Sequence, residues 1–322
     1  MLKNDLLSAF EVLSTQAKDL FLDKQICELF SEPTALEFSR DFVAKNRPVI
    51  IRGACSKWQA SSKWNAEFFR RTTYGRTLTK VAITPNGYAD GIAVKKPENQ
   101  EYFVLPEEQT MKMEDFLAKL EESANPNVYY IQKQNSNLSE DFPELLGDID
   151  MHALKFAFEA FNKEPDAVNF WMGDQRAITS LHKDPYENMY CVISGYKEFI
   201  LIPPTDYAYV NRRKYPVGTY KMAQNGEMFI DPVADESGEP IQIEWVSVDP
   251  LKPNHNKYPE FQKSTPFKVR VNEGDILYLP SLWYHHVQQS HKCIAVNFWF
   301  DMDYDARYCY YKFVEKLCGN GQ

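Results

Sequence analysis

Two histidines and one aspartate in this sequence could bind a metal ion together. His182 and Asp184 are two residues apart, so their side chains leave the same face of an extended strand. Later in the chain, His285 and His286 follow Trp283-Tyr284 inside a second apolar run. Two histidines and one carboxylate, with the remaining coordination positions open, form the ligand set of non-haem Fe(II) oxygenases. Because neighbouring residues in a strand face opposite ways, only one of His285 and His286 can complete this set.

The surrounding sequence predicts a β-barrel, which would bring these distant ligands together. From residue 167 onward, short apolar runs alternate with turn signals, a pattern typical of a sandwich or barrel. Ser194-Gly195 predicts a tight hairpin between the third and fourth of these strands. The strands are expected at 167–172, 177–182, 188–193, 197–202, 243–248, 267–271, 275–279, 284–288 and 293–300.

Helices and a few strands are predicted before the barrel. Apolar residues at helical spacing predict a helix that begins near Asn65 and others over 2–22, 33–45 and 113–120. The turn signal at Pro85 opens a loop expected over 85–100. Strands are predicted at 47–53, 81–84 and 128–132.

The barrel is predicted to be one domain over 47–302, preceded by a helical flank over 1–46. A long insertion at 205–265, rich in proline, tyrosine and acidic residues, is expected to act as a lid or binding surface. The C-terminal segment 303–322 is predicted to contain an aromatic helix over 305–317. This helix would pack on the barrel or on a second copy of the chain, which makes it a candidate for homodimerisation.

Composition narrows the partners and the compartment. The formal net charge of -9 argues against broad binding of nucleic acid and is compatible with a basic partner, such as a lysine-rich peptide. The six cysteines include no Cys-x-x-Cys pair, and the chain shows neither a secretory signal nor an apolar run that would span a membrane. We therefore expect a reduced, intracellular protein of the cytoplasm, the nucleus or both.

Five segments in order along the chain carry a family resemblance: 47–53 with Trp58 and Trp64, 166–171, 179–197, 274–287 and 297–299. Together they resemble the JmjC-domain, cupin-like Fe(II)/2-oxoglutarate oxygenases, and within them the small protein hydroxylases. The resemblance runs from about Arg47 to the C-terminus. It implies a mainly β fold with flanking helices around a double-stranded β-helix, or jelly-roll, core.

The resemblance also implies the ligands of iron and of its co-substrate. His182, Asp184 and His285 match the iron ligands, because the family ligand directly follows the aromatic pair; His286 is then expected to pack or to support the ligands. Lys197 matches the lysine that pairs with the far carboxylate of 2-oxoglutarate. It stands in a hydrophobic strand, where a buried lysine is rare unless an anion pairs with it.

Further polar residues are implied around the co-substrate. Thr179 and Tyr130 match hydroxyl donors to the same carboxylate, although a shift of one residue would exchange Tyr130 for Tyr129. Asn188 and Asn297 match polar positions near 2-oxoglutarate and the metal. Hydrogen bonding between strands is the alternative role for both asparagines.

The activity implied by the resemblance is O2-dependent hydroxylation of a lysine at carbon 3, the (3S)-lysyl product, in a protein substrate of the GTP-binding class. In this reaction 2-oxoglutarate is converted to succinate and CO2. Acidic residues of the insertion favour a basic target, although acidic loop residues are more often only solvated. These acidic residues are Glu227, Asp231, Asp235, Glu236, Glu239 and Glu244.

Three other functions stay open. A metal-dependent endopeptidase acting next to methylated arginine or lysine of histone tails could use the same ligands to activate water, but the zinc-peptidase motif His-Glu-x-x-His is absent. A histone lysine demethylase is a second alternative, against which the absence of a reader module argues. A non-enzymatic binding module is the third, and the retention of all three ligand positions together with Lys197 argues against it.

Overall fold

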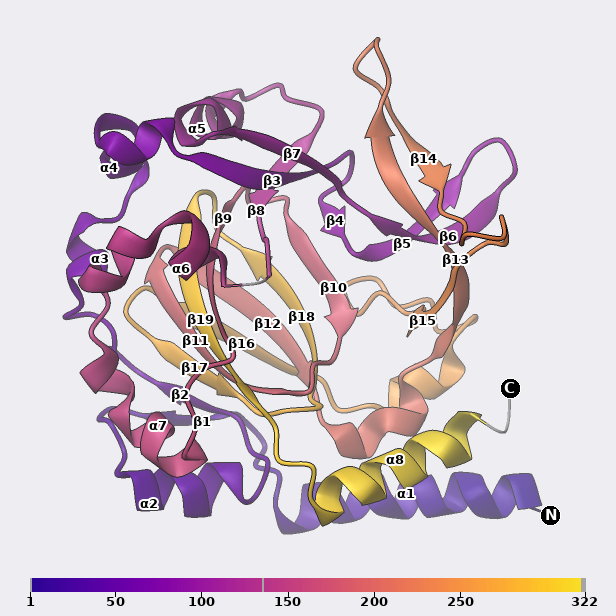
Figure 1. Ribbon diagram of the computed structural model, residues 1–322. Coiled ribbons are helices and arrows are strands. Elements are labelled where there is room, and N and C mark those ends of the chain that lie inside the picture. The colour runs from indigo at the N-terminus through magenta and orange to yellow at the C-terminus, as the bar shows by residue number, and fades with distance from the viewer. Residues whose placement is uncertain (1, 135, 320–322) are drawn as a thin grey trace.

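The barrel is built from two sheets that face each other (Figure 1). The computed structural model describes residues 2–134 and 136–319. In the larger sheet the strands run in the order β1 (Cys27–Leu29), β2 (Val49–Ile51), β17 (Ile276–Leu279), β11 (Tyr186–Ser194), β19 (Cys293–Asp301), β9 (Ala167–Gly173), β8 (Val128–Ile131), β3 (Leu78–Thr84) and β7 (Glu107–Lys112). The smaller sheet has the order β16 (Phe267–Asn272), β12 (Tyr196–Ile202), β18 (Tyr284–Gln289), β10 (Ile178–His182) and β4 (Tyr88–Ala89). This arrangement confirms the predicted jelly-roll fold.

The central strands of the larger sheet are buried on both faces. All residues from Cys293 to Phe300 in β19 are buried, and so are residues 187–193 of β11. Because both faces are covered, these strands are mostly apolar, and their exceptions are the buried polar residues Glu187, Asn188 and Asn297. One face packs against helices, and the other lines the barrel. All nine strands predicted from residue 167 onward are present, with ends shifted by at most two residues.

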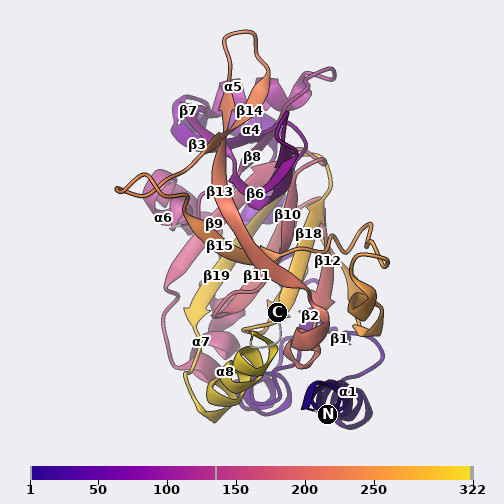
Figure 2. The ribbon, with the colours of Figure 1, turned by 90° about the vertical axis from the view of Figure 1, so that its right-hand side faces the viewer.

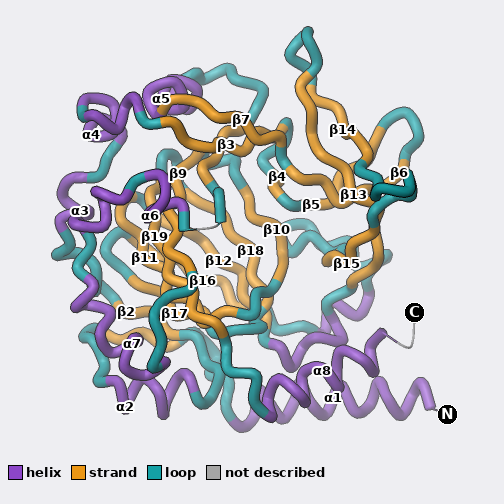
Figure 3. The backbone as a smooth tube through the Cα atoms, viewed as in Figure 1, coloured by secondary structure: helices purple, strands orange, loops and turns teal. Residues whose placement is uncertain are grey.

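Helices cover the outer face of the larger sheet (Figures 1 and 3), and their aromatic side chains pack against it. The rings of Phe38 and Phe156 pack edge to face with their centroids 4.9 Å apart, and those of Trp64 and Phe170 pack in the same way with centroids 5.9 Å apart. The helices are α2 (Ala35–Phe38), which continues as a π-helix (Ser39–Val43), α3 (Gln59–Lys63), α4 (Ala66–Arg71), α5 (Met113–Glu121), α6 (Asn137–Asp141) and α7 (Lys155–Phe161). Short 3-10 helices occupy Thr73–Arg76, Pro143–Asp148, Met151–Leu154, Pro204–Tyr209 and Pro259–Lys263.

The insertion is a β-structure, and it corrects two predictions. Segment 85–100 was expected as a loop, and so was 205–265 apart from the strand at 243–248. The structure instead has a third sheet with the order β14 (Met228–Pro232), β13 (Arg212–Met222), β6 (Gln100–Leu105) and β5 (Gly91–Lys95), while β15 (Gln242–Val246) also pairs with β13. Figure 2 shows the long β13 crossing the molecule in front of the barrel. The strand expected at 243–248 is present as β15, whereas β5, β13 and β14 were not predicted. β5 with β6, and β13 with β14, form hairpins between neighbouring segments, and only the pairing of β13 with β6 joins distant parts of the chain.

The predicted hairpin at Ser194-Gly195 is wrong. The strands before and after Gly195, β11 and β12, belong to different sheets and do not pair with each other. Gly195 has φ +80°, and a Cβ at this position would lie 2.3 Å from Ser290 Oγ. The turn signal was therefore real, but here the turn carries the chain from one sheet to the other.

The terminal helices lie at one end of the barrel (Figures 1 and 2). They are α1 (Leu2–Leu20) and α8 (Ala306–Gly319), and both were predicted. Residue 1 and residues 320–322 of the predicted flanks lie outside the described residues. Among the helices that the structure describes, none has the length and apolar character needed to cross a membrane.

Candidate metal centre

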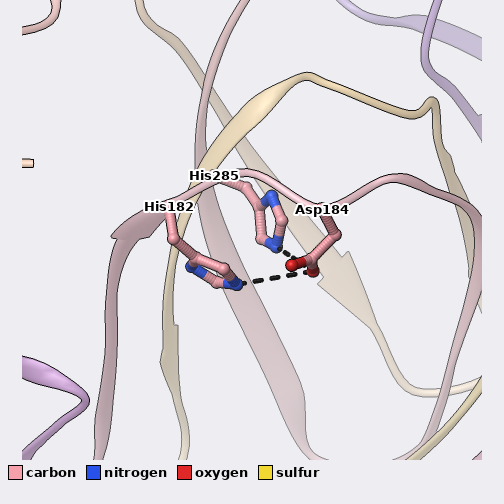
Figure 4. A group of neighbouring side chains, drawn as sticks. All are labelled: His182, Asp184 and His285. Atoms are coloured by element: carbon pink, nitrogen blue, oxygen red, sulfur yellow. Dashed lines mark ion pairs between the residues drawn. The ribbon is translucent and has the colours of Figure 1, made fainter. Parts of the chain in front are cut away.

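His182, Asp184 and His285 meet inside the barrel (Figure 4). His182 ends β10 and is the register partner of His285 on the antiparallel strand β18, and Asp184 follows two residues later. The Nε2 atoms of both histidines lie 3.5 Å from Oδ2 of Asp184. One ligand atom from each residue lies within 4.8 Å of the others, so the three side chains could bind one metal ion.

The main chain orients both imidazoles. Nδ1 of His182 lies 2.8 Å from the carbonyl oxygen of Ser180, and Nδ1 of His285 lies 3.1 Å from that of Trp283. With Nδ1 donating to the carbonyl oxygen, each Nε2 faces Asp184. This nitrogen donates to the carboxylate while it is protonated and offers a lone pair once a metal ion displaces that proton. Hydrogen bonds of this kind fix the ring orientation and tautomer of metal-binding histidines.

The electrostatics of the centre favour a charged carboxylate. Burial raises the pKa of Asp184, but the charge of His182 and hydrogen bonds from both histidines outweigh burial and hold that pKa well below its ordinary value. Burial lowers the pKa of His182, but the charge and hydrogen bond of Asp184 outweigh burial, so this pKa lies above its ordinary value. For His285, burial and the nearby His182 together hold the pKa below its ordinary value. An ionised carboxylate beside imidazole lone pairs is the protonation state that binds a metal ion.

His286 lies on the opposite face of β18 from His285. It is buried, and neither ring nitrogen has a hydrogen-bond partner among the described residues. Burial lowers the pKa of His286 to about 4. The structure thus brings His285, and not His286, to His182 and Asp184.

Lys197 lies deep in the same barrel, on β12. Its side chain is 1% exposed, and its ammonium group donates hydrogen bonds to the Tyr130 hydroxyl at 2.9 Å and to Oε1 of Gln289. Burial lowers the pKa of Lys197 to about 8, and no carboxylate of the described residues forms an ion pair with it. Tyr129, by contrast, packs into the core between the larger sheet and the helices. Alternation therefore selects Tyr130 for the barrel interior.

One cavity connects most of the predicted site residues. Tyr130, Thr179 and Asn188 line it together with Asn297 and the three metal-centre residues. Nδ2 of Asn297 donates to Oδ1 of Asn188 at 3.0 Å, so the two asparagines also link neighbouring strands. Lys197 does not line this cavity; it is linked to it by the hydrogen bond from its ammonium group to the hydroxyl of Tyr130.

Sequence reasoning missed two residues that support this site. Gln289 accepts from Lys197 and donates to the carbonyl oxygen of Asp174 at 2.9 Å. It stands four residues after His285, and the period of two in a strand could have placed it on the same face. Trp171 donates from Nε1 to Oδ1 of Asn297 at 2.7 Å, a contact that no local pattern announces.

Comparison with known proteins agrees with this fold. Residues 35–306 match the cupin-like domain family, and the chain belongs to that family. It is 43% identical to the bifunctional peptidase and (3S)-lysyl hydroxylase JMJD7 of Homo sapiens, over 94% of this chain and 92% of that protein. It is 36% identical to JmjC domain-containing protein E of Dictyostelium discoideum (95% and 92% covered) and 32% identical to lysine-specific demethylase JMJ32 of Arabidopsis thaliana (95% and 90% covered). The resemblance predicted from the five segments is confirmed.

Proposed function

We propose that the protein is an Fe(II)- and 2-oxoglutarate-dependent protein hydroxylase that acts on lysine, giving the (3S)-lysyl product. The observation that carries this proposal is the presence of the His182–Asp184–His285 cluster and the buried Lys197 in one barrel. The relative from Homo sapiens bears this activity in its name and is 43% identical. A protein of the GTP-binding class is the substrate that we propose.

The residues present fit both groups. Two imidazole nitrogens and one carboxylate on one side, facing a cavity on the other, suit Fe(II) with open positions, and these three residues would hold the iron. The far carboxylate of 2-oxoglutarate would be held by Lys197, with Tyr130 and Thr179 as hydroxyl donors. When bound, iron and 2-oxoglutarate supply the oxidation of a C–H bond by O2, with succinate and CO2 as co-products.

The chain itself contributes orientation, charge and exclusion of water. Ser180 and Trp283 hold the ligand imidazoles through their carbonyl groups. Phe199 and Val287 give the cavity an apolar wall. A bound carboxylate would raise the pKa of Lys197 again, because an opposite charge favours the ammonium form.

Peptidase and demethylase activities are the alternatives, and the names of the two relatives raise them. Both share the metal centre with the hydroxylase. A peptidase that activates water on the metal does not need 2-oxoglutarate. Loss of Lys197 should therefore abolish the two oxidative activities and spare peptide cleavage. A demethylase, in turn, differs from the hydroxylase in requiring a methylated lysine.

The test is succinate release from 2-oxoglutarate with Fe(II), with and without lysine-containing peptides. We expect turnover in the wild type, its loss in His182→Ala and Lys197→Ala, and no loss in the matched controls His152→Ala and Lys268→Ala, whose side chains are exposed. Peptide cleavage that survives Lys197→Ala but not His182→Ala, without succinate, would instead establish the peptidase.

Residues 47–302 would form the catalytic domain, with 1–46 and 303–322 as flanks. Helix α8 would join two copies of the chain, because Tyr310 and Phe313 are exposed on it; gel filtration of Tyr310→Ser/Phe313→Ser should then show a smaller species than the wild type. All six cysteines are free thiols, which suits the cytoplasm or nucleus.

A further inference from the structure

Three segments converge on Ser180, next to the metal centre. Its hydroxyl donates to the main-chain oxygen of Asp90 at 2.5 Å and accepts from Nε1 of Trp245 at 3.1 Å. Its carbonyl oxygen accepts from His182. Asp90 follows β4, which runs parallel to β10, and Trp245 belongs to β15 of the insertion. Ser180 therefore fixes both residues relative to a metal-centre histidine.

Trp245 forms an aromatic wall beside that histidine. Its ring is nearly parallel to the imidazole of His182, with an interplanar angle of 7° and 6.1 Å between the ring centroids. Phe103 supports the indole, with centroids 4.5 Å apart. An indole face attracts both methylene groups and cations.

Asp90 supplies a carboxylate without a counter-ion. Its side chain is half-buried and has no hydrogen bond or ion pair with any residue in the part of the chain that the structure describes. Burial is the main cause that raises the pKa of Asp90 to about 6, with a smaller contribution from Glu108 and an opposing one from His182. A desolvated carboxylate of this kind is strongly stabilised by a cation that enters the site.

We propose that Asp90 and Trp245 form the subsite for the ammonium group of the substrate lysine. This inference rests on the proposed function and names how that site selects its target. In a lysine that reacts at carbon 3, a methylene stem and an ammonium group extend beyond the reacting carbon. The stem would lie against Trp245, and the ammonium group would donate hydrogen bonds to Asp90. A free lysine should bind more tightly than trimethyl-lysine, which has no N–H to donate.

The test is binding of three short labelled peptides to the metal-free protein, measured by fluorescence anisotropy. The peptides are identical except for one central residue, which is lysine, norleucine or trimethyl-lysine. The wild type should bind the lysine peptide about ten-fold more tightly than the other two, as expected for a partly buried charge pair. Asp90→Asn should bind all three alike. This variant should fold, because asparagine tolerates the positive φ of 56° found at Asp90.

The matched control is Glu108→Gln. Glu108 is an exposed carboxylate on β7 that already pairs with Lys80 at 3.1 Å, so its loss should leave the preference for lysine intact. Equal binding of the three peptides by the wild type, or a lysine preference that survives Asp90→Asn, would overturn the subsite. Succinate release by the wild type is measured in parallel. Its absence would refute the proposed function, whereas the binding results alone decide the subsite.

Discussion

The two faces of the larger sheet share the same strands but hold different chemistry. On β11, Met189 faces the helices, whereas Asn188 faces the barrel interior; on β19, Phe298 and Asn297 divide in the same way. The outer face is an apolar core in which aromatic rings interlock. The inner face keeps polar groups that bond to one another or line the cavity. The period of two in a strand thus separates the groups that stabilise the fold from those that act in the site.

Strand β18 shows the same separation in adjacent residues. His285 and His286 are both buried, yet only His285 lies with His182 and Asp184. The residue type does not distinguish them; the face on which each lies does.

The largest expected effect is the difference in metal affinity between variants of His285 and His286. His285→Leu should weaken metal binding by more than about 100-fold, because even residues that only support ligands can contribute this much. His286→Leu should leave metal affinity unchanged and the free energy of unfolding equal or higher, since it removes two ring nitrogens that have no partner among the described residues. Calorimetric metal titration and urea unfolding measure both. Equal losses of metal affinity in the two variants would break the comparison.

The next effect concerns stability on the two faces of β19. Phe298→Ala should lower the free energy of unfolding by about 3–5 kcal/mol, because Phe298 is fully buried and packs edge to face on Trp58 at 6.5 Å. Asn297→Ala should cost only about 1–3 kcal/mol, the range for leaving the buried hydrogen-bond partners Trp171 and Asn188 unsatisfied. Urea denaturation of both variants decides the order, and a larger loss for Asn297→Ala would contradict the division of roles.

A pH-dependent effect is expected from Lys197, whose ammonium group is buried on the inner face. Its pKa of about 8 in the folded protein lies below the ordinary value of 10.5. Below pH 8 both the folded and unfolded states are protonated, so the folded state carries the full cost of a buried charge. Between these two values only the folded state loses the proton, and stability therefore rises with pH, by on the order of 3 kcal/mol in total.

Lys197→Met isolates this contribution. The free energy of unfolding of the wild type minus that of Lys197→Met should rise from pH 8 to pH 10, as measured by urea denaturation without ligand. Saturating 2-oxoglutarate should flatten the rise, because its carboxylate would keep Lys197 charged. A difference that stays constant with pH in the absence of ligand would show that burial does not govern Lys197.

The smallest effect is expected at the edge of the outer face. Thr34 begins α2 with a capping box in which its hydroxyl accepts from the main chain of Glu37 at 3.2 Å. Thr34→Ala should cost about 1 kcal/mol of stability, the usual value for such a cap, and should not change metal or peptide binding. Thermal unfolding beside a metal titration checks both statements; a change in metal affinity would show that the two faces are coupled.

Much of this protein could be predicted locally. The barrel strands from residue 167 onward follow from alternation and turn signals, and the spacing of His182 and Asp184 places both on one side of the chain. The strand β5 and the long β13 escaped prediction. β5 pairs with the neighbouring β6 in a hairpin that the turn signal at Pro85 obscured, whereas β13 pairs with β6 from a distant part of the chain. Gly195 was recognised as a turn, but its place between two sheets was not.

By itself the sequence determined which side chains share a face wherever a strand is regular, because its alternation is set by covalent geometry. The irregular register between Thr179 and His182, which lets both line the cavity, was decided by the tertiary structure. The sequence also determined the ligand types, since these are residue identities. Only the tertiary structure decided which strands become neighbours. It alone placed His285 opposite His182 and brought Gln289 within hydrogen-bond distance of Lys197. It also brought Asp90 and Trp245 together at Ser180. Strand pairing depends on the free energy of burying the whole sheet, which no local stretch contains.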